Sequence, residues 1–242
     1  MNYEVVRDDI SRFNANAIVL PANTRLKEGP GASAAIYESA GRKQLTEACG
    51  KARKKHGELE IGMAVPTLGF DLPADFIIHA ICPAWKDGNH GEYDLLSSAY
   101  ISSLRLADMM GCKTIAIPVL SSGNNGFDNE VAFEIACKSI ESFEPENKLE
   151  KVYLIVYNME MMAITKKHGV SVKENIDEQY ILGKRDHYKA FVGKAVLFGK
   201  EYAKKFIDDG VELVMEKLND PEWRKHVIMQ GAQIAWHALM GE

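Results

Sequence analysis

Short apolar runs alternate with longer amphipathic segments along the first two thirds of the chain. The runs are almost continuously apolar, which is typical of strands buried on both faces of a sheet. Polar residues, in several cases with glycine, follow most of the runs, and turns and loops are expected there. Strands are therefore predicted at Tyr3–Val6, Ala17–Leu20, Met63–Leu68, Phe76–Ile81, Thr114–Leu120 and Val152–Tyr157.

The segments between most of these runs show the period of an amphipathic helix, with apolar residues three or four positions apart. Strands that alternate with helices predict a mostly parallel sheet with helices on both faces, which is an α/β fold. Helices are predicted at Ala32–Ser39, Leu45–His56, Leu95–Met110, Asn129–Phe143 and Met159–His168.

The pattern changes near Asn175, after which we expect no further strand. Lysine, glutamate and aromatic residues follow at helical spacing, and aromatics at this spacing are typical of packing surfaces. We therefore predict an α/β domain over residues 1–172 and a helical C-terminal extension over residues 173–242. The extension is expected to pack on itself, on the α/β domain or on a second subunit, which would make a homo-oligomer.

Composition excludes few classes of protein. Hydrophobic residues make up 46% and charged residues 26%, as is ordinary for a globular chain. The net charge of −5 provides no general attraction for nucleic acid, and no stretch is apolar enough to span a membrane. The four cysteines lack metal-binding or disulfide-frame spacing, so we expect no metal, no cofactor and a reducing cytoplasmic location. The first residues, MNYEVVRDD, do not resemble a signal peptide.

Two loops carry the candidate chemistry. The strand at Ala17–Leu20 leads to Gly29-Pro30-Gly31 and then to a predicted helix start. Glycine lets a ligand approach the backbone, and the free N–H groups of a first helical turn can bind an anion. The loop has neither the P-loop pattern nor GxGxxG, and many turns of this kind bind nothing.

A second strand, Thr114–Leu120, runs into Ser121–Phe127, a series of mostly small or loop-forming residues. Asp128 then caps a predicted helix. Loops at the carboxyl ends of strands in one sheet can face each other across a ligand. The alternative is an ordinary connection, although this loop is longer than a connection requires.

Two polar residues allow a purely structural interpretation. Asp9 is followed by a turn-like segment and has the character of a turn or capping residue. His79 lies inside the apolar run FIIHAIC, where a histidine is more often part of the core than a catalyst.

Four stretches together resemble the macro domain, an α/β module that binds ADP-ribose. They are DDISRFNANAIVLPAN, GPGASAAIYESAG, the segment from IGMAVP to HAICPAW, and TIAIPVLSSGNNGF, and they occur in the family's order over about residues 1–168. The resemblance implies a three-layer α/β/α sandwich around a mixed, mostly parallel sheet. It implies ADP-ribose or an ADP-ribosylated macromolecule as the binding partner.

The resemblance also assigns residues by position. Asp9 and Ile10 fall at the adenine, Asn23 at the distal ribose, and Tyr157 where many members stack an aromatic ring on adenine. Catalytic roles, if any, fall to Asn23, Ser33 and Asn125. The two phosphate loops correspond to Gly31, Ala32 and Ser33, and to Ser122, Gly123, Asn124, Asn125, Gly126 and Phe127.

Several positions depart from the family pattern. Pro30 removes one N–H donor, and Ser33 replaces the aspartate with which hydrolytic members position water. Asn124-Asn125 stands where Ile-Tyr is usual. Three hypotheses follow: an enzyme that slowly hydrolyses an ADP-ribose linkage, a non-catalytic reader of ADP-ribose, and an interaction protein that uses its helical extension to dimerise.

Overall fold

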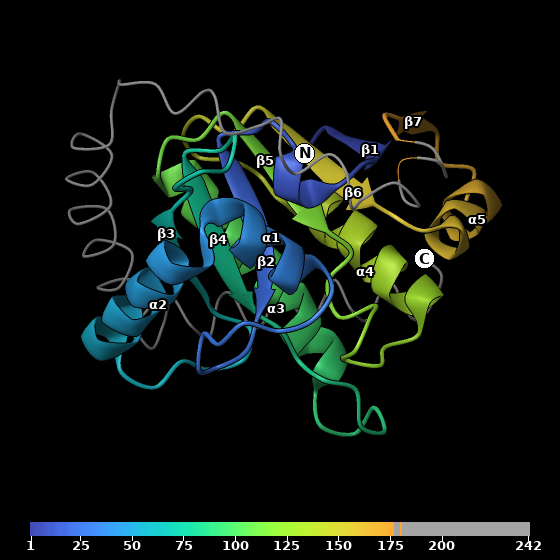
Figure 1. Ribbon diagram of the computed structural model, residues 1–242. Coiled ribbons are helices and arrows are strands. Elements are labelled where there is room, and N and C mark those ends of the chain that lie inside the picture. Colours follow the sequence, from blue (N-terminus) through green and yellow to red (C-terminus); the bar gives the residue numbers. More distant parts are fainter. Residues whose placement is uncertain (177–179, 181–242) are drawn as a thin grey trace.

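The computed structural model describes residues 1–176 and residue 180 (Figure 1). These residues form one seven-stranded sheet in the order β3-β4-β2-β5-β6-β1-β7, with helices on both faces. The strands are β1 (Tyr3–Arg7), β2 (Ala17–Ala22), β3 (Ala64–Leu68), β4 (Phe76–Ile81), β5 (Thr114–Pro118), β6 (Lys151–Val156) and β7 (Val172–Glu174).

The sheet is mixed and mostly parallel, as predicted. Strand β3 pairs antiparallel with β4 through a turn, and the other neighbouring strands are parallel. The prediction that the run ending at Tyr157 is the last strand was wrong, because β7 follows it at the edge of the sheet. The sheet therefore extends to Glu174, so the helical extension predicted over residues 173–242 does not begin at 173, where the chain is still in β7. The rest of that range lies almost wholly outside the described residues.

Helices cover the two faces and complete three layers (Figure 1). Helices α1 and α2 lie in front of the sheet in this view and pack on one core, while α3, α4 and α5 contribute to the core of the other face. A short 3-10 helix, η1, follows β1. Their bounds are η1 (Ile10–Arg12), α1 (Ala32–Ala40), α2 (Arg42–His56), α3 (Glu92–Met109), α4 (Asn129–Ser142) and α5 (Met159–Lys167).

Each central strand contributes side chains alternately to two cores. On β2, Val19 packs with the α3 and α4 side, whereas Ile18 and Leu20 pack with α1 and α2. All three side chains are almost fully buried. Burial on both faces explains why the strands appear in the sequence as continuous apolar runs.

The topology brings the candidate residues to one edge of the sheet. The loops that follow β1, β2, β4, β5 and β6 all leave the carboxyl ends of parallel strands. Strands β2 and β5 are direct neighbours, so the two glycine-containing loops begin side by side. Ligands of open α/β sheets bind at this edge. Among the described residues, no helix has the length and hydropathy that crossing a membrane requires.

Candidate ligand-binding site

The first loop ends at an open helix terminus. Gly31 is the N-cap residue of α1 and has φ 65°, a conformation that glycine adopts without the strain of a Cβ. No side chain of residues 1–176 or of residue 180 caps the helix there. The N–H groups of its first turn have no partner within the helix. Gly31 is exposed and Ala32 half-buried, so an anion can reach these groups.

Ser33 holds the first loop together. Its Oγ accepts a hydrogen bond from the backbone N–H of Gly29 at 3.0 Å, and the residue is only 3% exposed. A hydroxyl that accepts this bond retains one proton to donate, but it carries no charge. In this arrangement Ser33 shapes the first loop, and it provides no carboxylate that could activate water.

The side chain of Asn23 is turned into its own loop. Its carbonyl oxygen accepts bonds from the N–H groups of Arg25 and Lys27, at 3.1 and 3.2 Å. Its amide nitrogen donates to the carbonyl of Lys27 at 2.8 Å. Asn23 thus lies at the end of β2, as predicted, and fixes the start of the first loop.

Tyr37 of α1 holds the same loop through its buried hydroxyl, a role that was not predicted from the sequence. Its hydroxyl donates to the carbonyl of Leu26 at 2.9 Å and lies 3.2 Å from Cys49 Sγ. Burial raises the pKa of Tyr37 well above its usual range, so the phenol stays protonated. Leu26 has a positive φ of 49°, so this bond supports a turn that a leucine disfavours.

The second loop presents a series of unpaired backbone donors. Within the described part of the chain, no acceptor meets the N–H groups of Ser122, Gly123, Asn124 or Asn125. The turn is closed by Gly126, whose N–H donates to the carbonyl of Gly123 at 2.9 Å. Successive free N–H groups in a turn form a concave anion-binding surface.

In helix α4, which follows this loop, two N–H groups of the first turn are already occupied. The carboxylate of Asp128 accepts the N–H groups of Glu130 and Val131, both at 3.0 Å, as predicted for a capping residue. The turn before Gly126 therefore offers free N–H groups, whereas those of Glu130 and Val131 are occupied by Asp128.

An aromatic cluster supports the second loop from the β4 side. The backbone N–H of Trp85 donates to the carbonyl of Asn125 at 2.7 Å, and the Trp85 ring meets Phe127 edge-on at 5.3 Å. Phe127 is 4% exposed, so it supports the loop from inside. Tyr93 packs against both rings. The link between Trp85 and Asn125 was not predicted.

Glu92 fixes the segment that carries Trp85. One carboxylate oxygen accepts the N–H groups of residues 86, 87 and 88, and the other accepts that of His90 at 2.7 Å. Burial of Glu92 opposes its ionisation, but these backbone donors outweigh that effect and lower its pKa to about 2. A charged Glu92 keeps this segment rigid beside the second loop.

Asp9 lies at the other end of the proposed site, directly after β1. It is 4% exposed and caps η1, because its Oδ1 accepts the N–H of Ser11 at 3.1 Å and the Ser11 hydroxyl at 2.8 Å. The capping interpretation of Asp9 is therefore confirmed. Its Oδ2 accepts the hydroxyl of Tyr180 at 3.3 Å. Ile10, the first residue of η1, is buried.

Tyr157 follows the last residue of β6, the strand next to β1, and is half-buried. Its carbonyl accepts a bond from Arg7 Nε at 3.4 Å. The sheet order thus places Asp9 and Tyr157 on adjacent strand ends. His79, by contrast, is 1% exposed in β4 and bonds to Thr67 Oγ1 at 2.9 Å, which confirms its place in the core.

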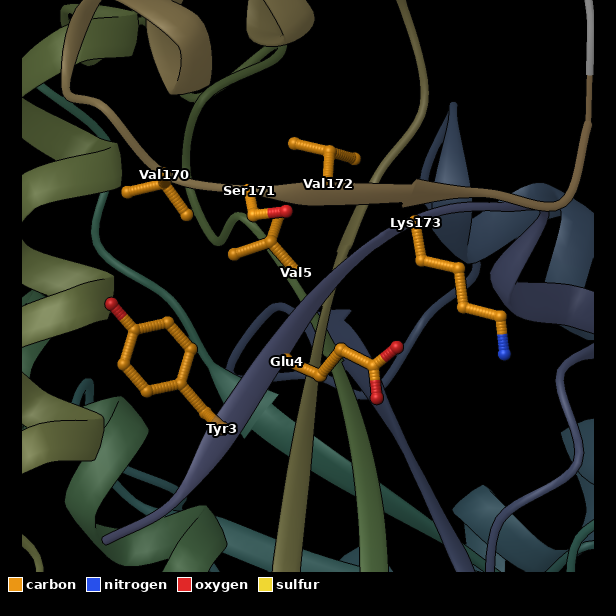
Figure 2. A pocket seen from close by; sticks show the side chains of 7 residues that line it. All are labelled: Tyr3, Glu4, Val5, Val170, Ser171, Val172 and Lys173. Carbon is orange, nitrogen blue, oxygen red and sulfur yellow. The ribbon is translucent and has the colours of Figure 1, made fainter.

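One hollow of about 410 Å³ lies elsewhere, between β7 and the beginning of β1 (Figure 2). Tyr3 and Glu4 extend to different sides of β1 there, as neighbouring strand residues do. This is the amino end of β1, opposite the end that leads to Asp9. None of the predicted site residues lines the hollow, so it is separate from the candidate site.

The fold places the two donor-rich loops at the carboxyl edge of a mostly parallel α/β sheet, the edge at which proteins of this class bind their ligands. The family described as Macro domain matches residues 19–136. The chain is 41% identical over 157 residues to an O-acetyl-ADP-ribose deacetylase of Escherichia fergusonii, covering 64% of this chain and 88% of the relative. This chain belongs to the macro domain family.

Other relatives support the same family assignment. An O-acetyl-ADP-ribose deacetylase of Escherichia coli is 38% identical, over 64% of this chain and 88% of the relative. The Oceanobacillus iheyensis macrodomain with ADP has a TM-score of 0.64 and 30% identity, and the match covers 75% of this chain and 92% of that one. The three-layer fold that the resemblance implied is therefore confirmed.

Proposed function

We propose that this chain binds ADP-ribose, with the diphosphate held between its two glycine-containing loops. The observation that carries the proposal is the pairing of β2 with β5, which brings two sets of free backbone N–H groups together. One set begins α1 after Gly31, and the other runs from Ser122 to Asn125. A doubly charged diphosphate matches donors on both sides, and the bound ADP of the Oceanobacillus iheyensis relative supports this assignment.

In this proposal the order of the strands determines how ADP-ribose lies along the edge of the sheet. The base lies near Asp9 and Tyr157, at the ends of β1 and β6, where a carboxylate can accept an exocyclic amine. The distal ribose lies near Asn23, at the end of β2. The diphosphate crosses the end of β5 between them.

We further propose slow hydrolysis of an ADP-ribose derivative, for which an acetyl ester is the first candidate. Relatives named O-acetyl-ADP-ribose deacetylase support this choice of substrate. Ester hydrolysis needs an oriented water near the distal ribose. Asn23 and Asn125 are polar groups of the two loops, but amides cannot serve as general bases at neutral pH.

The residue at position 33 determines how fast we expect hydrolysis to be, because Ser33 bonds to Gly29 and provides no base. Without a carboxylate at position 33, we expect the ligand's own diphosphate to orient the water. We expect turnover below that of a macro domain with a positioned base, by the factor of roughly 10²–10⁴ that such a base contributes. A non-catalytic reader of ADP-ribosylated macromolecules is the alternative, and the replacement at position 33 favours it.

The cellular location and the oligomeric state are also proposals. The four cysteines are free thiols, which fits the proposed cytoplasmic location. A homo-oligomer formed through the helical extension is proposed from sequence, because that extension lies outside the described residues.

Calorimetric titration with ADP-ribose tests binding, and release of acetate from O-acetyl-ADP-ribose tests catalysis. Saturable binding with slow acetate release is the expected result. Binding without any release leaves the reader function, and absence of binding contradicts the proposal as a whole.

A further inference from the structure

The carboxylate proposed to receive the base is already occupied on both oxygens. Asp9 Oδ1 accepts two bonds from Ser11, and Asp9 Oδ2 accepts the phenolic hydroxyl of Tyr180 at 3.3 Å. Tyr180 lies 171 positions away along the chain. Beyond Ile176 it is the one residue that the structure describes.

The ring of Tyr180 has a defined position on the surface of η1. The guanidinium carbon of Arg12 lies 3.9 Å from the ring centroid, within the range of a cation–π contact. Arg12 Nε in turn bonds to Asp8 Oδ1 at 3.2 Å. Arg12 therefore contacts the ring of Tyr180, and Asp9 accepts its hydroxyl.

We propose that Tyr180 is an internal occupant of the base subsite, where its hydroxyl takes the acceptor that Asp9 offers to the exocyclic amine of the base. This inference rests on the proposed function, which places the base at Asp9. A phenolic O–H and an exocyclic N–H are both single donors to a carboxylate oxygen, so one can replace the other.

Three features of the geometry favour the exchange. A hydroxyl that donates to a carboxylate normally lies 2.5–2.7 Å from it, whereas Tyr180 lies at 3.3 Å. The two bonds from Ser11 keep the Asp9 carboxylate in place when Tyr180 leaves. Arg12 has 41% of its side chain exposed, so the contact with the ring is partly in solvent.

The consequence is a lowered affinity for ligands that carry a base. When the free protein holds Tyr180 on Asp9, the binding-competent fraction falls and the apparent dissociation constant rises in proportion. A ligand without a base, such as ribose 5-phosphate, does not compete with Tyr180 and shows no such effect.

The test is Tyr180→Phe in the full chain, which removes the hydroxyl and keeps the ring over Arg12. We expect ADP-ribose to bind roughly threefold to tenfold more tightly, the range that one hydrogen bond contributes. Affinity for ribose 5-phosphate should stay the same. Tyr153→Phe is the matched control, because Tyr153 lies on β6 and packs against Phe13 at 5.0 Å, and it should bind both ligands as the unmodified chain does.

The outcomes separate this inference from the proposed function. If the unmodified chain binds ADP-ribose and Tyr180→Phe binds it equally or more weakly, Tyr180 does not compete for Asp9 and the inference is wrong. If Tyr180→Phe gained as much affinity for ribose 5-phosphate as for ADP-ribose, the inference would also be wrong, because the gain would not depend on the base. Failure of every variant to bind ADP-ribose would refute the proposed function and, with it, this inference.

Discussion

Ser33 Oγ accepts the backbone N–H of Gly29 at 3.0 Å, so the side chain at this position holds the first loop closed. The bond is local, because the two residues are four positions apart and flank Gly31. A loop held in this way keeps its N–H groups oriented without a ligand, which reduces the ordering cost of binding. The same bond gives Ser33 a structural role at a position where catalysis would need a base.

Replacement of Ser33 by aspartate should increase hydrolysis. An aspartate can still accept the N–H of Gly29, and it adds a carboxylate that can position water and take a proton. Acetate release from O-acetyl-ADP-ribose is expected to rise by up to the roughly 10²–10⁴-fold that a positioned base provides.

Ser33→Asn is the matched control, because asparagine has nearly the size of aspartate and can accept the same bond without a charge. It should show no gain in hydrolysis. Fast turnover by the unmodified chain that Ser33→Asp weakens would show that another residue of the site drives the reaction.

Asp9→Asn should weaken ADP-ribose binding and leave the fold unchanged. Asparagine keeps an oxygen for the bonds from Ser11 and is as good a capping residue as aspartate. It replaces the second acceptor by a donor, which cannot receive the amine of the base. The loss should be about 1–3 kcal/mol, the range for a hydrogen bond to a charged group and for an unsatisfied donor.

Calorimetry with ADP-ribose and with ribose 5-phosphate measures the effect of Asp9→Asn. The ligand without a base should be insensitive to the substitution. Equal weakening of both ligands would place the base away from Asp9.

Stability should fall as the pH drops below about 6, through His79. Burial lowers the pKa of His79 from 6.5 to about 3, so the folded state keeps the ring neutral while the unfolded state binds a proton. The unfolded state then binds more protons, and stability is lost as the pH falls from about 6.5 towards 3. One such group contributes a slope of at most about 1.4 kcal/mol per pH unit.

Urea unfolding at pH 7, 6 and 5 measures this slope, with His79→Gln as the comparison. The glutamine can donate to Thr67, the partner of His79, but does not titrate. Its free energy of unfolding should depend less on pH between 6 and 5. An equal slope in both proteins would mean that other groups, such as His56, account for the dependence.

The sequence predicted the central sheet well because its strands are buried on both faces. Ile18 and Val19 point to opposite cores, so β2 had to be apolar at every position. Strand β7 was missed because it is short and lies at the edge, where Lys173 and Glu174 are exposed. A polar edge strand has no pattern that distinguishes it from a loop.

The conformation of the two loops was predictable where glycine determines it. Gly31 and Gly126 both have positive φ values, as glycines in tight loops often do. The supporting contacts were not predictable, because they join residues far apart along the chain. Trp85 meets Asn125 across 40 positions and Tyr180 meets Asp9 across 171, and neither spacing follows from a local period.

The most direct test of the central claim is calorimetric titration of ADP-ribose into Gly123→Glu. Gly123 is exposed, and a Cβ added there would meet no atom within 4 Å, so the fold should tolerate the change. Gly50→Glu on α2 adds the same charge at a position with equal space and serves as the control. A glutamate beside the free N–H groups of the second loop would repel the diphosphate and fill its place. We expect saturable binding to the unmodified chain and to Gly50→Glu, and none to Gly123→Glu; unchanged affinity in Gly123→Glu would contradict the account.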